Sequence, residues 1–553
     1  MAIQQILTFE GGLSTKISPH LIGRNEGIIC QNVDLEKGSL HPLQDFSLEA
    51  TTTGKYTEHY NGSYIANADP DDERFYAEYA GRLYWSNAGY GTYGLMRYDG
   101  TNTGIDAEAP SPLNELAKPT PNASTEFGRL TNNASYTYAI TVVDADGIES
   151  TPIFTDEVAL SNPNDLSILL SVNKVNMDTY LPTGHTMNLY RTGGANPTYN
   201  LIMENMSPDN PAVIDGDIDP DYATGHYHFL DDKADIDVSR IELTTFENTP
   251  PPEDLDMLIE NLGTFWGSVN NRIYFSRVGT PEFWGQLDYV VLDKPCTGLG
   301  IFSDYIMAFT ESGAYRIAGY SRDTVQVEKL PYNQGCVNKD TITNIDTYLV
   351  WVSKNGVCLF DGSQIQVMTK QKLGWDDFNL VDDLSYDDFS ETQQWNTGSG
   401  FEVTFSRGYR DKYFGIYSGG IGILDMSSGV KFYTVEFQGA DSLFYNEIDN
   451  VLFIVKGTEI YSYNTSNNLM TATWKSGRVA DEGTNVNKHY RDVELDGTPI
   501  SVEVFIDGES KKIYYGKSRF KLPAGSIGRD IQFEIKTNTE IRSLKYEYTT
   551  LKA

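Results

Sequence analysis

The chain has few basic residues for its length. Its 553 residues include 42 lysines and arginines against 77 aspartates and glutamates, a formal net charge of −35 at pH 7. A protein that grips nucleic acid needs a cationic surface to displace the counterions of the phosphates, so stable nucleic-acid binding is not expected. DNA as a passing cargo stays open, because like charge keeps a polyanion away from a wall. The acidity fits equally well with a large assembly that charge keeps soluble.

Cysteine and long apolar runs are also scarce. The four cysteines form no Cys-x-x-Cys pair, which is typical of free thiols in a reducing cytosol rather than of a disulfide scaffold. No run of about 18 consecutive apolar residues occurs, so we expect no membrane span. The first residues, Met1 to Leu7, lack the basic and apolar parts of a signal peptide. We therefore expect synthesis in the cytoplasm.

Helical periodicity is nearly absent. Only residues 252–262 predict one short helix, because no other segment combines an apolar stripe with caps. Short apolar or aromatic segments instead alternate with period two and end at Gly, Asn or Asp turns, as in 305–317, 348–360 and 451–463. This is the pattern of β-hairpins. Together with 36 Tyr and 25 Phe, it predicts an all-β protein.

The hairpins repeat between about residues 260 and 475. Their spacing of about 40–50 residues is that of propeller blades. An apolar-Asp-Gly turn occurs at both 98–100 and 360–362, so one copy lies far upstream of the main array. The sequence therefore predicts an interrupted β-propeller. Residues 1–118 would hold the N-terminal strands and a first propeller segment, and residues 241–475 the other blades.

Prolines border the interruption at Pro119 and at 250–252. Between these borders, short strands with turns every 8–12 residues or so predict a small β-sandwich over residues 119–240. This insertion looks similar to a fibronectin-type-III module. Residues 476–553 alternate cleanly again and predict a second, C-terminal β-sandwich.

Four aspartates form the clearest candidate metal site. They are Asp215, Asp217, Asp219 and Asp221. Their alternation resembles the start of a calcium loop, but an EF-hand would need Gly and Glu where the chain has Pro220 and His226. A looser surface calcium site and a solvated acidic loop are both open interpretations.

The remaining motifs are weaker. His226 and His228 could supply two imidazoles from one face of a strand, but no cysteine ligand lies near them. Residues 89–94 match G-x-G-x-x-G, yet a strand and turn follow where a dinucleotide site needs a helix. No nucleophile elbow or zinc-protease motif occurs. We therefore expect no enzyme activity, no catalytic residue and no cofactor.

Several segments follow one family's pattern in order. The opening segments are 9–12 (FEGG), 31–34 (QNVD) and 37–42 (KGSLHP), and the middle ones are 271–276 (NRIYFS), 279–284 (GTPEFW), 306–317 (IMAFTESGAYRI) and 351–357 (WVSKNGV). As a set they resemble the tail tubular or nozzle proteins of short-tailed bacteriophages, also described as packaged-DNA-stabilising proteins. Residues 188–192 (NLYRT) resemble the sandwich inserted in these proteins. The resemblance covers most of the chain and rests on strands and turns.

The resemblance implies a structural virion protein. Its subunits would form the distal nozzle ring of the tail, a homohexamer, in contact with the tail adaptor protein and with tail fibre or tail-tip proteins. The ring would retain packaged DNA and conduct it during ejection. Larger relatives carry additional tip insertions, and the sequence shows no segment that we can assign to one. The sequence does not identify the residues that line the DNA channel.

Two other functions are open. A propeller with sandwiches could be a tail adhesin that binds host glycans through exposed aromatic side chains. It could also be a glycan-cleaving tail protein, which would need two carboxylates at a defined separation in one cleft. With 77 acidic residues, no such pair stands out in the sequence.

Overall fold

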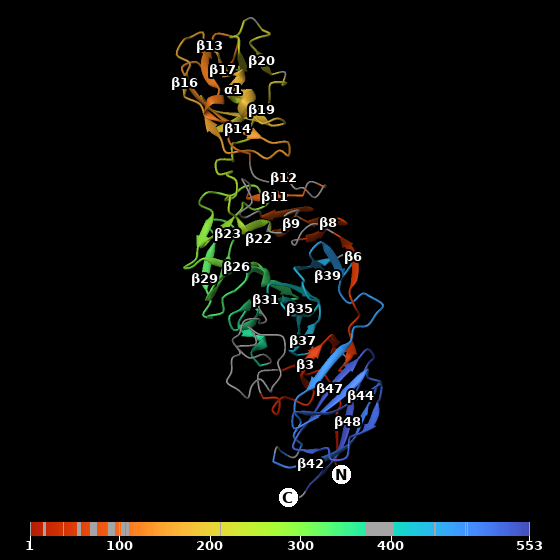
Figure 1. Cartoon of the computed structure of the whole chain (residues 1–553). Coiled ribbons are helices and arrows are strands. Elements are labelled where there is room, and N and C mark those ends of the chain that lie inside the picture. The colour runs from red at the N-terminus through yellow and green to blue at the C-terminus, as the bar shows by residue number, and fades with distance from the viewer. Residues whose placement is uncertain are drawn as a thin grey trace.

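The structure is a computed structural model. It describes residues 2–551 apart from 15–17, 37, 52–56, 67–73, 87–93, 99, 101–104, 107–109, 211, 220, 372–402, 428, 447–448, 482 and 484. Strands dominate this part of the chain, and its single α-helix is α1 (Lys174–Tyr180). The predicted all-β class is confirmed. Figure 1 shows a central ring of sheets between an inserted module at one end and a module with both chain termini at the other.

Small antiparallel sheets surround one axis in the centre, the arrangement of a β-propeller (Figure 1). They consist of five four-stranded sheets, the first four strands of a ten-stranded sheet, and one two-stranded hairpin. The strands before the insertion are β6 (Ser47–Thr51), β7 (Thr57–Tyr60), β8 (Ser63–Ala66), β9 (Phe75–Tyr79), β10 (Arg82–Ser86), β11 (Leu95–Arg97) and β12 (Ile105–Asp106).

The later blades run from β22 to β40. Their strands are β22 (Asp256–Asn261), β23 (Thr264–Val269), β24 (Arg272–Phe275), β25 (Tyr289–Val291), β26 (Cys296–Phe302), β27 (Tyr305–Thr310), β28 (Gly313–Ala318), β29 (Gln326–Lys329), β30 (Thr343–Ile345), β31 (Tyr348–Ser353), β32 (Gly356–Phe360), β33 (Ile365–Val367), β34 (Phe405–Tyr409), β35 (Lys412–Tyr417), β36 (Gly420–Asp425), β37 (Lys431–Val435), β38 (Ser442–Asn446), β39 (Val451–Lys456) and β40 (Glu459–Ser462). Two 3-10 turns, η3 (Lys339–Thr341) and η4 (Met368–Gln371), flank the β30–β33 blade.

The ring closes by joining distant parts of the chain. The innermost strands β9, β22, β26, β30, β34, β38 and β7 contact one another in that order. Strand β6 pairs with β40, so an N-terminal strand completes the last blade. Tyr60 and Ile65 of the β7–β8 hairpin pack with Leu83 of β10 and close the circle. The hairpin turns at Asn61 and Gly62 with positive φ at both residues, as a tight Asn-Gly turn requires.

The predicted helix over residues 252–262 is wrong. Residues 256–261 form β22, the innermost strand of a blade, and a bulge lies between Asp256 and Ile259. Met257 has a positive φ of 57° at this bulge. Met257 and Leu258 are both buried, on opposite sides of the strand. A strand that is buried on both sides has a short run of consecutive apolar residues, and periodicity alone does not distinguish such a run from a buried helix.

Two antiparallel sheets that share one apolar core make up the insertion between β12 and β22. Its elements are η1 (Glu115–Ala117), β13 (Thr120–Ser124), β14 (Ser135–Val143), β15 (Ile153–Phe154), β16 (Val158–Ala159), β17 (Ser167–Asn173), α1, β18 (Thr186–Gly193), β19 (Asn196–Met206), β20 (Val213–Asp215), β21 (His226–Asp231) and η2 (Asp235–Asp237). One sheet has the order β13-β17-β21-β20 and the other β15-β14-β18-β19. The similarity to a fibronectin-type-III module stays a prediction.

The C-terminal strands pack with strands from the N-terminus. The elements are β1 (Ala2–Ile6), β2 (Gly12–Leu13), β3 (Glu26–Gln31), β4 (Val33–Asp34), β5 (His41–Pro42), β41 (Ala472–Ser476), β42 (Lys488–Leu495), β43 (Ser501–Ile506), β44 (Glu509–Tyr515), β45 (Arg519–Lys521), β46 (Ile527–Gly528), β47 (Ile531–Thr537) and β48 (Leu544–Thr550). Strand β1 pairs with β48, and β3 lies between β37 and β41. Residues 476–553 therefore do not build this module alone.

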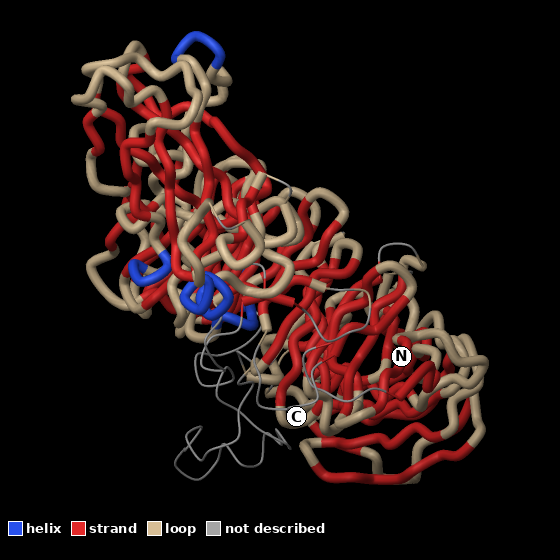
Figure 2. Tube along the Cα trace, turned by 90° about the horizontal axis from the view of Figure 1, so that it is seen from above, coloured by secondary structure: helices blue, strands red, loops and turns tan. Residues whose placement is uncertain are grey.

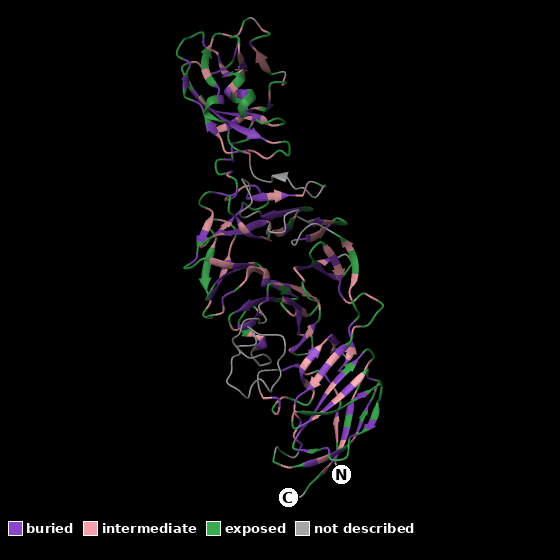
Figure 3. Cartoon of the chain, in the orientation of Figure 1, coloured by how far each residue is buried: buried purple, intermediate pink, exposed green. Residues whose placement is uncertain are grey.

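Buried residues follow the strands in all three parts of the molecule (Figure 3). Seen from above, strands make up most of the molecule and the helices are only a few short turns (Figure 2). No helix within the described ranges is long and apolar enough to cross a membrane.

Candidate functional site

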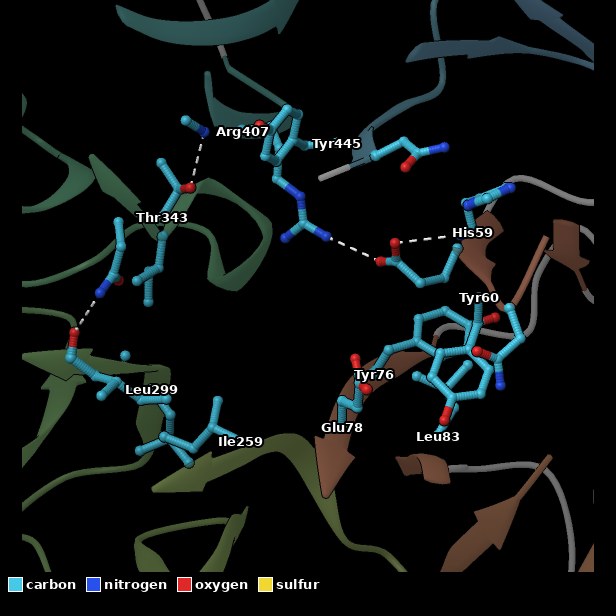
Figure 4. A pocket seen from close by; sticks show the side chains of 18 residues that line it. His59, Tyr60, Tyr76, Glu78, Leu83, Ile259, Leu299, Thr343, Arg407 and Tyr445 are labelled. Carbon is cyan, nitrogen blue, oxygen red and sulfur yellow. Dashed lines mark hydrogen bonds and ion pairs between the residues drawn. The ribbon is translucent and has the colours of Figure 1, made fainter. Parts of the chain in front are cut away.

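The innermost strands of the propeller enclose a central cavity of about 620 Å³. This volume is in the usual range for small-molecule sites. Strands β7, β9, β22, β26, β30, β34 and β38 all contribute to its wall. Its polar and aromatic residues are Glu58, His59, Tyr60, Asn61, Tyr76, Glu78, Thr343, Asn344, Arg407, Tyr445 and Asn446 (Figure 4).

An ion pair joins two non-adjacent blades across the cavity. Arg407 Nη2 of β34 lies 3.1 Å from Glu58 Oε2 of β7 (Figure 4). The backbone N–H of His59 donates to the other carboxylate oxygen at 3.2 Å. Burial raises the pKa of the Glu58 carboxyl above its ordinary value, and the positive charge of Arg407 opposes that shift. The pair therefore holds a desolvated carboxylate in a fixed position.

A close approach of two blades sets the position of Arg407. The N–H of Gly408 donates to Thr343 Oγ1 at 2.8 Å, which ties β34 to β30. A Cβ atom at Gly408 would lie only 2.2 Å from the carbonyl oxygen of Asn344. Only glycine allows this approach, so the residue after Arg407 fixes the distance between the two strands.

Glu78 of β9 supplies a second carboxylate to the cavity. Its side chain is exposed to the cavity, and within the described part of the chain no hydrogen bond or ion pair joins it. Tyr60 and Tyr76 lie on the same side (Figure 4). Burial raises the pKa of the Tyr60 hydroxyl, and the charge of Glu78 raises it further.

A smaller cavity of about 160 Å³ adjoins the first. It shares Glu58, Tyr76 and Arg407 with the central cavity and adds Arg74 and Lys339. Lys339 Nζ lies 2.7 Å from Asp256 Oδ2. Among the residues that the structure describes, the two cavities offer paired charges, a Glu78 carboxylate without a counter-ion, and tyrosine rings.

The predicted calcium loop is filled by a lysine of the chain itself. Lys174 Nζ lies 2.5 Å from Asp215 Oδ1 and 2.7 Å from Asp217 Oδ2. Hydrogen bonds with this ammonium lower the pKa of both carboxyls. Asp219 accepts from the N–H of Asp221 at 3.1 Å and shapes the turn. In the ranges that the structure describes, no group of three or more His, Cys, Asp or Glu residues could hold a metal; calcium binding here stays a prediction.

The two histidines of β21 make ordinary hydrogen bonds. The ring Nδ1 of His228 lies 2.8 Å from Ser171 Oγ, and its Nε2 lies 3.2 Å from the carbonyl oxygen of Ala223. His226 lies 3.1 Å from the carbonyl oxygen of Thr224. The G-x-G-x-x-G motif at 89–94 lies mostly outside the described residues.

Sequence reasoning did not identify the cavity residues. Glu58 and Arg407 are 349 positions apart and belong to no motif. Glu78 lies in a strand with ordinary alternation of side chains. That its side chain lines the cavity depends on how the propeller ring closes, which the sequence of the strand does not show. The only signal was the propeller prediction itself, because the innermost strands of a propeller line its axis.

Comparison with known proteins leaves the fold description as it stands. No protein-family model and no curated protein matches the chain. Among solved structures, Hsv2 of Kluyvelomyces marxianus matches at 9% identity and a TM-score of 0.24, over 53% of this chain and 70% of that one. The Neurospora crassa Pan2 WD40 domain matches at 10% identity and a TM-score of 0.23, over 55% of this chain and 87% of that one. The Dos1 propeller matches at 10% identity and a TM-score of 0.27, over 77% of this chain and 96% of that one.

Proposed function

We propose that this chain is a structural subunit of a short-tailed bacteriophage tail, where copies of it form the distal nozzle ring. The observation that carries the proposal is the order of the family-like segments along the blades. Residues 271–276, 306–317 and 351–357 fall on the β23–β24, β27–β28 and β31–β32 hairpins of three consecutive blades. Several segments in the same order on successive blades support an architecture shared with the nozzle proteins more strongly than any single motif does.

The charge distribution supports a conduit. Residues 476–553 hold 13 basic and 12 acidic residues, so residues 1–475 carry a formal net charge of −36 against −35 for the whole chain. An acidic wall repels DNA and lets it pass as cargo without stable binding. In this proposal the subunits form a closed homohexamer that contacts the tail adaptor and tail fibre or tip proteins. The function is mechanical, not enzymatic.

The test uses purified full-length chain and particles that lack it. The mass of the chain is measured in solution, and its binding to tail stumps is followed by electron microscopy and by DNA retention. Closed rings on the stumps with restored retention are expected. A chain that does not bind the tail stumps but binds cells or glycans would refute the proposal.

A glycan-cleaving or glycan-binding tail protein is the second candidate. The observation that favours it is that Glu58 and Glu78 line one cavity together with Tyr60, Tyr76 and Tyr445. A carboxyl with a raised pKa such as Glu58 is suited to act as a general acid. The test is hydrolysis of host surface glycans by the native chain and by Glu58→Gln, with product detected by mass spectrometry. Absence of hydrolysis by the native chain would eliminate the enzyme, and equal hydrolysis by both proteins would eliminate Glu58 as its general acid.

A further inference from the structure

The charges of the central cavity do not balance. Glu58 has Arg407 as its counter-ion at 3.1 Å. Glu78 has no counter-ion within the described residues, although its exposed side chain lines the same cavity. A cation that enters the cavity is therefore attracted to the Glu78 carboxylate. The acidity of the whole chain also raises the local concentration of cations.

Aromatic rings surround the Glu78 side of the cavity. Tyr60 and Tyr76 line it directly, and each packs on a second ring behind it. The Tyr60 and Tyr98 centroids are 6.1 Å apart, and the Tyr76 and Trp85 centroids are 5.9 Å apart. Such faces attract cations through the ring quadrupole. The Trp85 ring already makes such a cation–π contact, because the Arg74 guanidinium lies 4.9 Å from its centroid.

The neighbouring wall is apolar. Ile259 of β22 and Leu299 of β26 line the same cavity as the tyrosines (Figure 4). Ile342 lines it as well. A bare metal ion or a fully hydrated cation would gain nothing from this wall. A ligand that combines one positive charge with a hydrocarbon chain would use both parts of the cavity.

We propose that the central cavity binds an ammonium group carried on an aliphatic chain. The Glu78 carboxylate is its counter-ion, the Tyr60 and Tyr76 rings lie beside it, and the chain covers Ile259 and Leu299. The ammonium could belong to a free alkylamine or to a lysine side chain of a partner protein, since both present the same chemistry. The proposal is independent of ring assembly, because the cavity lies inside one chain.

Isothermal titration of the full chain with butylammonium at low salt tests the proposal. Glu78→Gln keeps the shape of the side chain and removes its charge, and we expect it to weaken binding at least about tenfold. Glu157→Gln, on the exposed surface of the inserted module, is the matched control and should bind as the native chain does. Thermal melts of all three proteins show whether the variants are folded.

Two further ligands distinguish the sources and the alternatives. A Gly-Lys-Gly peptide blocked at both ends offers only a side-chain ammonium. Binding of this peptide indicates a protein partner, and binding of butylammonium alone indicates a free amine; either outcome supports the cavity as an ammonium site if Glu78→Gln weakens it. Neutral sugars that bind while both amines fail, or amine binding that Glu78→Gln leaves unchanged, would overturn the proposal.

Discussion

The guanidinium of Arg97, on propeller strand β11, donates a hydrogen bond to the carboxylate of Asp146, in the turn after β14 of the inserted module. The Arg97 side chain is only 6% exposed, so this contact satisfies a nearly buried charge at the junction of the two parts. Asn248 adds to the junction by donating to the carbonyl oxygen of Glu149 at 2.9 Å.

Asp146→Ala should therefore loosen the inserted module. The substitution leaves Arg97 without its counter-ion and should cost about 1–2 kcal/mol at the junction. Limited proteolysis should cut the connections near residues 110–119 and 239–250 faster than in the native chain. Asp209→Ala, at an exposed position of the same module, is the control and should be cut at the native rate. Equal rates for both variants would mean that the bridge does not hold the module.

Lys174 explains how the aspartate loop can be stable without a metal. If its ammonium occupies the place of a cation, Lys174→Met should leave Asp215 and Asp217 free to bind calcium. Calcium should then raise the melting temperature of the variant by a few degrees, because a ligand that binds only the folded state stabilises it. The native chain and the Lys118→Met control should not respond. A calcium response of the native chain equal to that of the variant would show that Lys174 does not block the site.

The strands could be predicted from the sequence, but their partners could not. The alternation over 305–317 and 348–360 correctly predicted the hairpins β27–β28 and β31–β32. Successive side chains of a strand point to opposite faces of the sheet, so apolar residues at every second position indicate a strand. Nothing local shows that β6 completes the blade of β40, or that β1 pairs with β48. The cavity depends on such long-range pairing, which is why Glu58 and Arg407 meet without sharing a motif.

Asp361 should make the β30–β33 blade sensitive to acid. Its Oδ1 accepts from the N–H groups of Ser363 and Gln364, both at 2.8 Å, and these bonds lower the pKa of Asp361 from 3.8 to about 2. The folded chain thus binds this proton less tightly than the unfolded chain. The stability that Asp361 contributes is present above about pH 4 and is lost as the pH falls towards 2.

Asp361→Ala should therefore lower the melting temperature at pH 7, and the difference from the native chain should shrink below pH 4. Calorimetry at several pH values measures this difference. Asp323→Ala, an exposed aspartate of a neighbouring blade, should show no such trend. A deficit of Asp361→Ala that stays constant down to pH 2 would contradict the assigned role of the carboxylate.

The cysteines should be inert in the folded chain. None of the four forms a disulfide, and burial raises the pKa of Cys336 and Cys358 to about 12 and that of Cys296 to about 11. Thiolate, the reactive form, is therefore rare at pH 8. Ellman's reagent should label the native chain slowly and all four thiols rapidly in denaturant. Rapid labelling of the native chain at pH 8 would show that the blades around Cys336 open.

Phe9 should hold the two chain ends together. Its ring packs edge-on against Trp474 with centroids 4.9 Å apart, and both side chains are fully buried. Phe9→Ala removes this contact and leaves a cavity between N-terminal and C-terminal strands, which should cost about 3–5 kcal/mol. Because β1 and β3 pair with β48 and β41, the loss should spread to residues 476–553. Hydrogen exchange should rise in β47 and β48 of Phe9→Ala and stay native in Leu7→Ala, where the side chain is exposed. Faster exchange confined to residues 1–46 would mean instead that the C-terminal strands are stable without the N-terminal ones.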